Sequence, residues 1–326
     1  MKSKQVSEKL GPAFNRLFSA SVISNLSDGL LAVAAPLLAI SLTKDPVLIS
    51  MLSAFVMLPW LLFAIPIGLI VDRSNKRLLI TLTNSIRFIT AGLVALAIST
   101  DTITIYWLLL ATFLIGTCEV ATDTAAQSLI PVILEKKNFE KANSRMNIAE
   151  TVIQNFIGAP LSGFLYATAI VLPFILNSLG FLIAAIFVFM IPAHLISQGS
   201  SVETTVLEKK SFISEIKFGL NYLWNDRPLR RLVATTTSLG LFYSLSTSTL
   251  ILFITEILEV QAKYFGVLMA GAGSGGVLGG ILTPVLSKKF GRGAVLAVAI
   301  FISSITVLFQ GLSPNVWVFG VIGFIS

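Results

Sequence analysis

The chain has 326 residues, of which 55% are hydrophobic and 12% are charged, with a formal net charge of +7. A soluble domain has about 25% charged residues, so this composition excludes an ordinary water-facing surface and favours a lipid bilayer as solvent. A single cysteine and a single histidine exclude a disulfide framework and a histidine cluster. We therefore expect neither a metal site nor a cofactor.

The apolar residues are gathered into runs that are long enough to cross a membrane. Residues 78–98 contain one charge, Arg87, and about 20 helical residues rise about 30 Å, the thickness of the hydrocarbon core. Such runs and the turn signals between them predict nine spans, at 14–42, 48–70, 78–99, 104–131, 146–168, 172–195, 229–255, 263–287 and 294–311. A tenth span opens at Val316, and we expect the sequence to stop inside it. The first span is too long for a cleavable signal peptide and is expected to be a signal anchor.

The positive charges predict the orientation of these spans. With the amino terminus placed inside, all but three of the 23 Lys and Arg residues fall in loops on the inner side. The exceptions are Lys44 and Lys263 outside and Arg87 within a span. The basic charge is thus a topology signal, which indicates a multi-pass protein of a bacterial inner membrane with a cytoplasmic amino terminus and no nucleic-acid partner.

The longest polar stretch predicts a division of the chain. Residues 196–228 form a cytoplasmic linker between an amino-terminal six-helix bundle, 1–195, and an incomplete carboxy-terminal bundle, 229–326. Apolar residues of the linker recur at helical spacing and predict an amphipathic helix on the membrane surface: Phe212, Ile216, Leu220 and Leu223. The alternative is a loop that only tethers the two bundles.

The most specific motif lies between the second and third spans, where residues 68–77 read GLIVDRSNKR. It resembles the G-x-x-x-D-R-x-G-x-K/R loop signature of the major facilitator superfamily, with Asn75 in place of a glycine. The resemblance implies an all-α fold of two six-helix halves, here with the second half truncated in its tenth span. It also implies a gating role for the signature residues Gly68, Asp72, Arg73, Lys76 and Arg77. We expect Gly68 to let a neighbouring helix approach and Asn75 to tolerate a left-handed turn.

Two further segments resemble particular branches of that superfamily. Residues 158–163, GAPLSG, resemble the G-x-P-x-x-G element of proton-coupled exporters, which implies that Gly158, Pro160 and Gly163 belong to an antiporter element in a bent helix. The run from Ser128 to Asn143 resembles the subgroup that contains macrolide-efflux proteins and the enterobactin exporter. Ile115 stands where that subgroup often has arginine, so no arginine role is carried over.

The eighth predicted span contains a stripe of small residues at Gly271, Gly275 and Gly279. Small residues four apart allow two helix backbones to approach closely. In the superfamily the fifth and eighth spans face each other across the two halves, so the resemblance implies a sliding helix interface. Static packing is the alternative.

Four charged residues fall well inside predicted spans, away from the span ends: Asp28, Arg87, Glu119 and Asp123. Each costs about 2.5–3.5 kcal/mol at a helix centre, so they must pair or meet water. Asp28 continues a polar stripe of the first span, and Glu119 and Asp123 share a face of the fourth. The resemblance places both faces on a central cavity.

These charges carry the functional hypothesis. Burial disfavours the ionised form of a carboxyl, so Glu119 or Asp123 can load and release a proton, with Asp28 serving cavity polarity or substrate cations. Guanidinium stays charged, so Arg87 is expected to be a counter-ion. The alternative is that Arg87 is locked to one acid simply to permit insertion.

The whole pattern predicts a secondary transporter, monomeric and embedded in the lipid bilayer. The leading interpretation is a proton-coupled antiporter that exports amphipathic small molecules such as a drug, antibiotic or siderophore, and thereby contributes to multidrug resistance. The alternative is a proton-coupled symporter that imports a small nutrient. An enzyme is not expected, because no nucleophile with its base and no metal-ligand cluster is evident.

Overall fold

The computed structural model describes residues 10–192, 219, 221–248, 250–260 and 289–325, together with single positions between 264 and 287. Helices and short turns account for these residues, and no strand occurs among them. The expected all-α class is confirmed. Most of the predicted linker, with Phe212, Ile216 and Leu220 of its amphipathic helix, lies outside the described residues.

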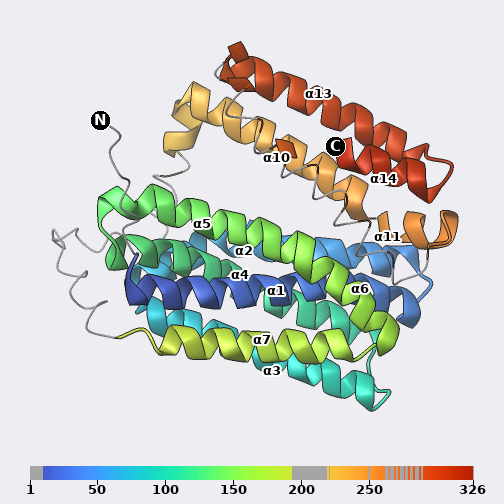
Figure 1. Ribbon diagram of the computed structural model, residues 1–326, viewed down its shortest axis with the longest axis horizontal. Coiled ribbons are helices and arrows are strands. Elements are labelled where there is room, and N and C mark those ends of the chain that lie inside the picture. The colour runs from blue at the N-terminus through green and yellow to red at the C-terminus, as the bar shows by residue number, and fades with distance from the viewer. Residues whose placement is uncertain are drawn as a thin grey trace, which may run out of the picture.

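The first six predicted spans are present as one helical bundle (Figure 1). Their bounds differ from the expected ones by a few residues at most ends, and the fifth span is built from several consecutive elements. The elements are α1 (Gly11–Leu42), α2 (Pro46–Arg73), α3 (Lys76–Ser99), α4 (Ile105–Ile133), η1 (Lys136–Asn138), α5 (Phe139–Thr151), η2 (Val152–Gly158), α6 (Ala159–Thr168) and α7 (Leu172–Phe189).

The second half lies along one side of this bundle (Figure 1). Its seventh span comprises three elements, and its last two elements form a helical pair. They are α10 (Arg227–Ser248), α11 (Leu250–Leu252), η4 (Phe253–Ile257), α13 (Arg292–Gly311) and α14 (Val316–Ile325). Contacts join α10 to α2 and α11 to α1.

Six described helices are long and apolar enough to cross a membrane: α1, α2, α3, α4, α7 and α13. In α2 only 17% of the most apolar stretch is buried within the protein. Large side chains such as Leu61 and Ile65 therefore point outward, at 81% and 55% exposure, and lipid is the solvent that accommodates them.

The fifth span bends through a π-helix. The residues before Pro160 form the π-helical element η2, and α6 starts with this proline in its first turn. Proline has no N–H to donate, and its ring collides with the carbonyl four residues earlier in a regular α-helix. A π-turn widens the helix at that point, so the expected bend is realised as a local change of helix type.

The glycine that precedes this proline packs directly on α1. A Cβ on Gly158 would lie 2.9 Å from the Cα of Gly29 and 3.0 Å from the carbonyl oxygen of Leu26. Nearby, the buried Ser162 hydroxyl donates to the carbonyl of Leu30 at 2.6 Å. In this structure the segment of residues 158–163 therefore holds the fifth span against the first, within one half.

The loop signature ties the α2–α3 turn to the end of α7. Nε and Nη2 of Arg77 donate to the Phe189 carbonyl at 3.1 and 2.5 Å, and the guanidinium lies 4.8 Å from the Phe189 ring centroid. Arg16 of α1 donates to the next carbonyl, Met190, at 2.5 Å. The last carbonyls of a helix have no partner within it, so the two arginines cap α7.

Two expectations about this loop are wrong in detail. Asn75 is in an extended conformation, with φ −69° and ψ 104°, and its side chain accepts from the N–H of Leu78 as the N-cap of α3. It replaces glycine by capping a helix, not by adopting a left-handed turn. Around Gly68, a Cβ would meet no atom within 4 Å, so no close helix approach explains this glycine in the observed conformation.

The close α1–η2 contact predicts that Gly158→Ala destabilises the protein. The added methyl must push two backbones apart, and such overpacking costs about 1–3 kcal/mol. Unfolding of the purified protein in detergent measures the effect. Gly240→Ala in α10 is the matched control, because nothing lies within 4 Å of its Cβ position. Equal stability of the two variants would contradict the packing role.

Candidate functional site

Arg87 of α3 is the centre of the polar interior. Its side chain is 0% exposed, Nη1 donates to the Ser24 hydroxyl at 3.0 Å, and Nη2 donates to the carboxylate of Asp28. The guanidinium carbon also lies 3.9 Å from the ring centroid of the fully buried Phe181 in α7. Among the described residues Nε has no hydrogen-bond partner. One cation thus links α1, α3 and α7, and Asp28 is its closest ion-pair partner.

Further carboxylates surround this pair. Glu119 Oε2 of α4 lies 3.9 Å from Arg87 Nη2, at the outer limit of an ion pair. Asp123, one turn along α4, interacts electrostatically with Glu119, Arg87 and Glu150 of α5. The structure thus brings together all four buried charges predicted from sequence. It adds Glu150 of α5, an exposed residue that was not among the charges singled out from the sequence.

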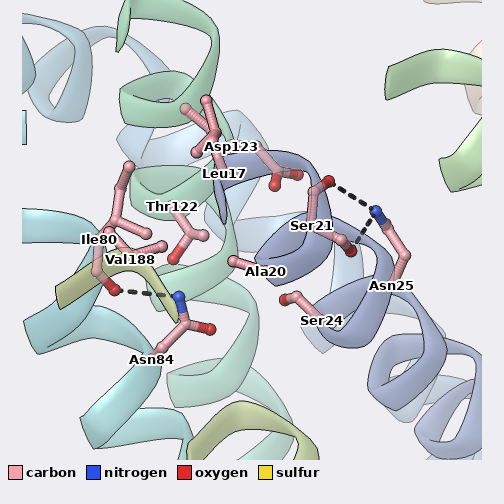
Figure 2. Close-up of a pocket in the computed structure, with 11 residues that line it drawn as sticks. Leu17, Ala20, Ser21, Ser24, Asn25, Ile80, Asn84, Thr122, Asp123 and Val188 are labelled. Atoms are coloured by element: carbon pink, nitrogen blue, oxygen red, sulfur yellow. Dashed lines mark hydrogen bonds between the residues drawn. The ribbon is translucent and has the colours of Figure 1, made fainter. Parts of the chain in front are cut away.

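Asp123 and Asn84 line a small polar pocket between α1, α3 and α4 (Figure 2). The centre of a water-sized group can move within about 20 Å³ of this pocket, which is room for one or two small polar groups. Polar and apolar side chains share its wall: Leu17, Ala20, Ser21, Ser24, Asn25, Ile80, Asn84, Thr122, Asp123, Ala126 and Val188.

Asn84 was not singled out from the sequence, although it lies three residues from Arg87 and shares its helix face. Its amide nitrogen donates to the Ile80 carbonyl at 2.9 Å. Figure 2 shows the amide oxygen on the opposite side, turned toward α1 and Ser24. Asn84 is 1% exposed, and among the described residues its oxygen has no partner.

Other buried polar side chains that sequence reasoning missed join the helices. Asn177 of α7 donates to the Ser27 carbonyl at 2.6 Å, and Ser178 donates to the Phe88 carbonyl at 2.8 Å. The hydroxyls of Thr83 and Thr122 are 2.7 Å apart. Such hydrogen bonds between spans fix the helices relative to one another.

The two halves meet at the end of the bundle where α1 ends and α2 begins. The buried apolar residues of this contact come from both halves: Val33, Leu37, Ile49, Ala159, Ile254 and Phe319. Lys44 Nζ and Glu256 Oε1 form an ion pair at 3.5 Å across the contact, with side chains 84% and 57% exposed. We call these residues the end contact.

The glycine stripe of the eighth span is described only at single positions. At Gly275 the atoms nearest to a Cβ all belong to Phe324 of α14, so α14 is its neighbour, and not the fifth span as expected. For Gly271 and Gly279 no atom of another described part of the chain lies within 4 Å of the Cβ position. A sliding interface with the fifth span therefore remains a prediction.

The described residues contain no group of three or more His, Cys, Asp or Glu side chains arranged to hold a metal ion. The acidic residues around Arg87 contribute negative charge to the interior.

Comparison with known families matches residues 10–326 to a family described as "Transmembrane secretion effector". The match covers nearly the whole chain. The chain belongs to this family of the major facilitator superfamily. The comparison with curated proteins found no match.

Solved structures show the same fold. A bacterial homologue of the human lysosomal transporter Spinster, in an inward-facing and unoccupied conformation, aligns with a TM-score of 0.64 at 17% identity, covering 96% of this chain and 72% of that one. Its inward-facing and occupied form aligns with a TM-score of 0.57 at 16% identity, covering 96% and 70%. The predicted major facilitator fold is confirmed, and this facilitator is a multi-pass secondary transporter of small molecules in a lipid membrane.

The Arg87–Asp28 pair predicts a large and asymmetric mutational effect. Arg87→Met leaves Asp28 buried without its cation, which costs about 3–5 kcal/mol, whereas removing both charges together is far less harmful. We expect Arg87→Met to unfold readily and the double variant Arg87→Met/Asp28→Leu to recover most of the loss, as measured by denaturant titration in detergent.

Lys44→Met is the control for this experiment, because it removes an exposed ion pair worth about 1 kcal/mol or less. Equal destabilisation by Arg87→Met and the double variant would show that the guanidinium stabilises the fold independently of Asp28.

Proposed function

We propose that this facilitator is a proton-coupled antiporter that exports amphipathic small molecules across a bacterial inner membrane, with its amino terminus in the cytoplasm. The observation that carries the proposal is the excess of carboxylates around one fixed cation inside the first six-helix bundle. Asp28 forms the close ion pair with Arg87, so the positive charge of Arg87 compensates the negative charges of Glu119 and Asp123 less fully.

Proton coupling follows from the chemistry of these groups. A carboxyl beside other carboxyls gains from binding a proton, because protonation removes both repulsion and desolvation cost. Arg87 cannot release its proton and sets a constant positive charge. Glu119 and Asp123 therefore exchange the proton, while Arg87 and Asp28 remain a fixed pair.

Two observations support export as the direction. The matched family is described as a secretion effector. In addition, residues 158–163, with Gly158, Pro160 and Gly163, resemble the element of proton-coupled exporters. Gly158 packs on α1 at the π-helical bend before Pro160. The subgroup resemblance favours a drug, an antibiotic or a siderophore as cargo.

Neutralising the two carboxylates tests the proton role. In inverted vesicles with an imposed proton gradient, we expect Glu119→Gln or Asp123→Asn to abolish gradient-driven uptake of a fluorescent amphiphile. Glu135→Gln, on an exposed side chain beside Lys137, is the matched control. Full activity of both Glu119→Gln and Asp123→Asn would contradict a role of these carboxyls as proton carriers. Uptake in right-side-out vesicles alone would show that transport is import and not export.

The end contact indicates how access alternates. Its apolar residues close one end of the bundle, whereas the Asp123 pocket is lined by residues 17–25 of α1, near the opposite end. The exposed Lys44–Glu256 pair adds little stability. Such a contact can open and reform during each cycle, and the cytoplasmic amino terminus proposed here makes the observed state open to the inside.

Cross-linking of the end contact should stop transport. On a Cys118→Ala background, Lys44→Cys/Glu256→Cys treated with a bifunctional methanethiosulfonate reagent is expected to lose export. Cleavage of the link with dithiothreitol should restore it, since the residues must separate in each cycle. Lys44→Cys alone is the control. Undiminished transport by the fully cross-linked protein would rule out opening at this contact.

A further inference from the structure

We propose that the pocket beside Asp123 binds the protonated amine of the substrate, so that the preferred cargo is an amphiphile with a primary ammonium group. This inference rests on the proposed function and names the substrate class of the same site. It depends on three independent features of the pocket: its charge, an unsatisfied acceptor in its wall, and its size.

The first feature is the sign of the charge. Asp28, Glu119 and Asp123 each interact electrostatically with Arg87, and Glu119 and Asp123 also interact with Glu150. The five groups together have a formal charge of −3 when all four carboxyls are ionised. Within the described residues, Arg87 is the only Lys or Arg within 4 Å of these carboxylates. A cation that enters the pocket is therefore attracted, and an anion is repelled.

The second feature is the buried amide of Asn84. Its nitrogen must face the Ile80 carbonyl, because the reverse orientation would bring two oxygens together, so the amide oxygen is fixed on the pocket side. A buried acceptor without a donor costs about 1–3 kcal/mol. A ligand that brings a hydrogen-bond donor to this oxygen recovers that cost.

The third feature is the match between the pocket and an ammonium group. An ammonium has three donors and no acceptor, and the pocket offers the Asp123 carboxylate, the Asn84 oxygen and serine hydroxyl oxygens. In Figure 2 the Asp123 carboxylate points toward Ser21 of α1. The space open to the centre of a water-sized group is about 20 Å³, which suits a compact ammonium better than a bulkier trimethylammonium. The apolar wall residues, Leu17, Ala20, Ile80, Ala126 and Val188, suit the alkyl chain next to the amine.

Matched fluorescent probes test this inference by equilibrium binding. The purified protein in lipid nanodiscs is titrated with dansylcadaverine, which has a primary ammonium, and with its N-acetyl and N-trimethyl derivatives, with empty nanodiscs subtracted. We expect dansylcadaverine to bind at least about tenfold more tightly than either derivative, since charged hydrogen bonds are worth about 1.5–3 kcal/mol.

Variants of the pocket locate the binding. Asp123→Asn should weaken dansylcadaverine binding about tenfold or more, and Asn84→Leu by a smaller factor, while neither changes the weak binding of the acetylated probe. Asp123→Glu keeps the charge and should keep the preference, which guards against a folding defect in the neutral variant. Asp101→Asn is the control, because this exposed residue has φ 53°, a conformation that asparagine also accepts.

Several outcomes would overturn the inference. These are equal affinity for the three probes, unchanged affinity in folded Asp123→Asn, or loss of probe binding when choline chloride is replaced by sodium chloride, which would assign the pocket to a metal ion. The binding is measured without a gradient. A failure of proton-driven export with intact amine preference would therefore reject the proposed coupling and leave the amine site standing.

Discussion

The buried ion pair between Arg87 and Asp28 is the interaction on which the first half of this transporter depends. A guanidinium with no exposed surface must find partners inside the protein, and it finds them in Ser24, Asp28 and the ring of Phe181. These partners lie on α1 and α7, so one charge fixes the positions of two helices relative to α3. Removing the charge from water is costly, and these partners make the burial tolerable.

The same pair sets the chemistry of the interior. Asp28 pairs with Arg87, and Glu119 lies at the outer limit of ion-pair distance from the same guanidinium. The negative charge of Asp123, which lines the pocket, is compensated less fully. A fixed cation next to carboxyls that can change their protonation is an arrangement in which a proton and a cation compete for the same oxygens. The hydrogen bonds of Asn177 and Ser178 to the backbones of α1 and α3 keep this arrangement rigid while the two halves move.

The contact between the two halves is made by residues other than those of the charged cluster. The end contact joins the halves through apolar side chains and an exposed ion pair, and none of its residues belongs to the charged cluster. Along α1, Ser21 and Leu37 are separated by roughly 24 Å of helix rise. The charged cluster and the end contact thus occupy different parts of one helix.

The sequence by itself determined the solvent, the helices and the family. Long apolar runs require a bilayer because unpaired backbone groups cannot face lipid, and the loop at residues 68–77 carried the resemblance to the superfamily. The spacing of Glu119 and Asp123 also placed both carboxyls on one helix face, because helical periodicity is a local property. The four buried charges could be found in the same way, since a charge inside an apolar run is visible without any structure.

Only the tertiary structure decided which of these charges pair and what the glycines contact. Arg87 and Asp28 are 59 residues apart, and nothing in their spacing distinguishes Asp28 from Glu119 as the closer partner. Gly158 packs on Gly29 and Gly275 packs on Phe324, whereas no atom of the described residues lies within 4 Å of a Cβ placed on Gly68. The sequence predicted a close approach of helices at all three glycines. The unsatisfied oxygen of Asn84 is equally invisible in the sequence, because hydrogen-bond satisfaction depends on neighbours that are distant along the chain. Local periodicity fixes which face of a helix is polar, and packing between helices selects the partner that this face meets.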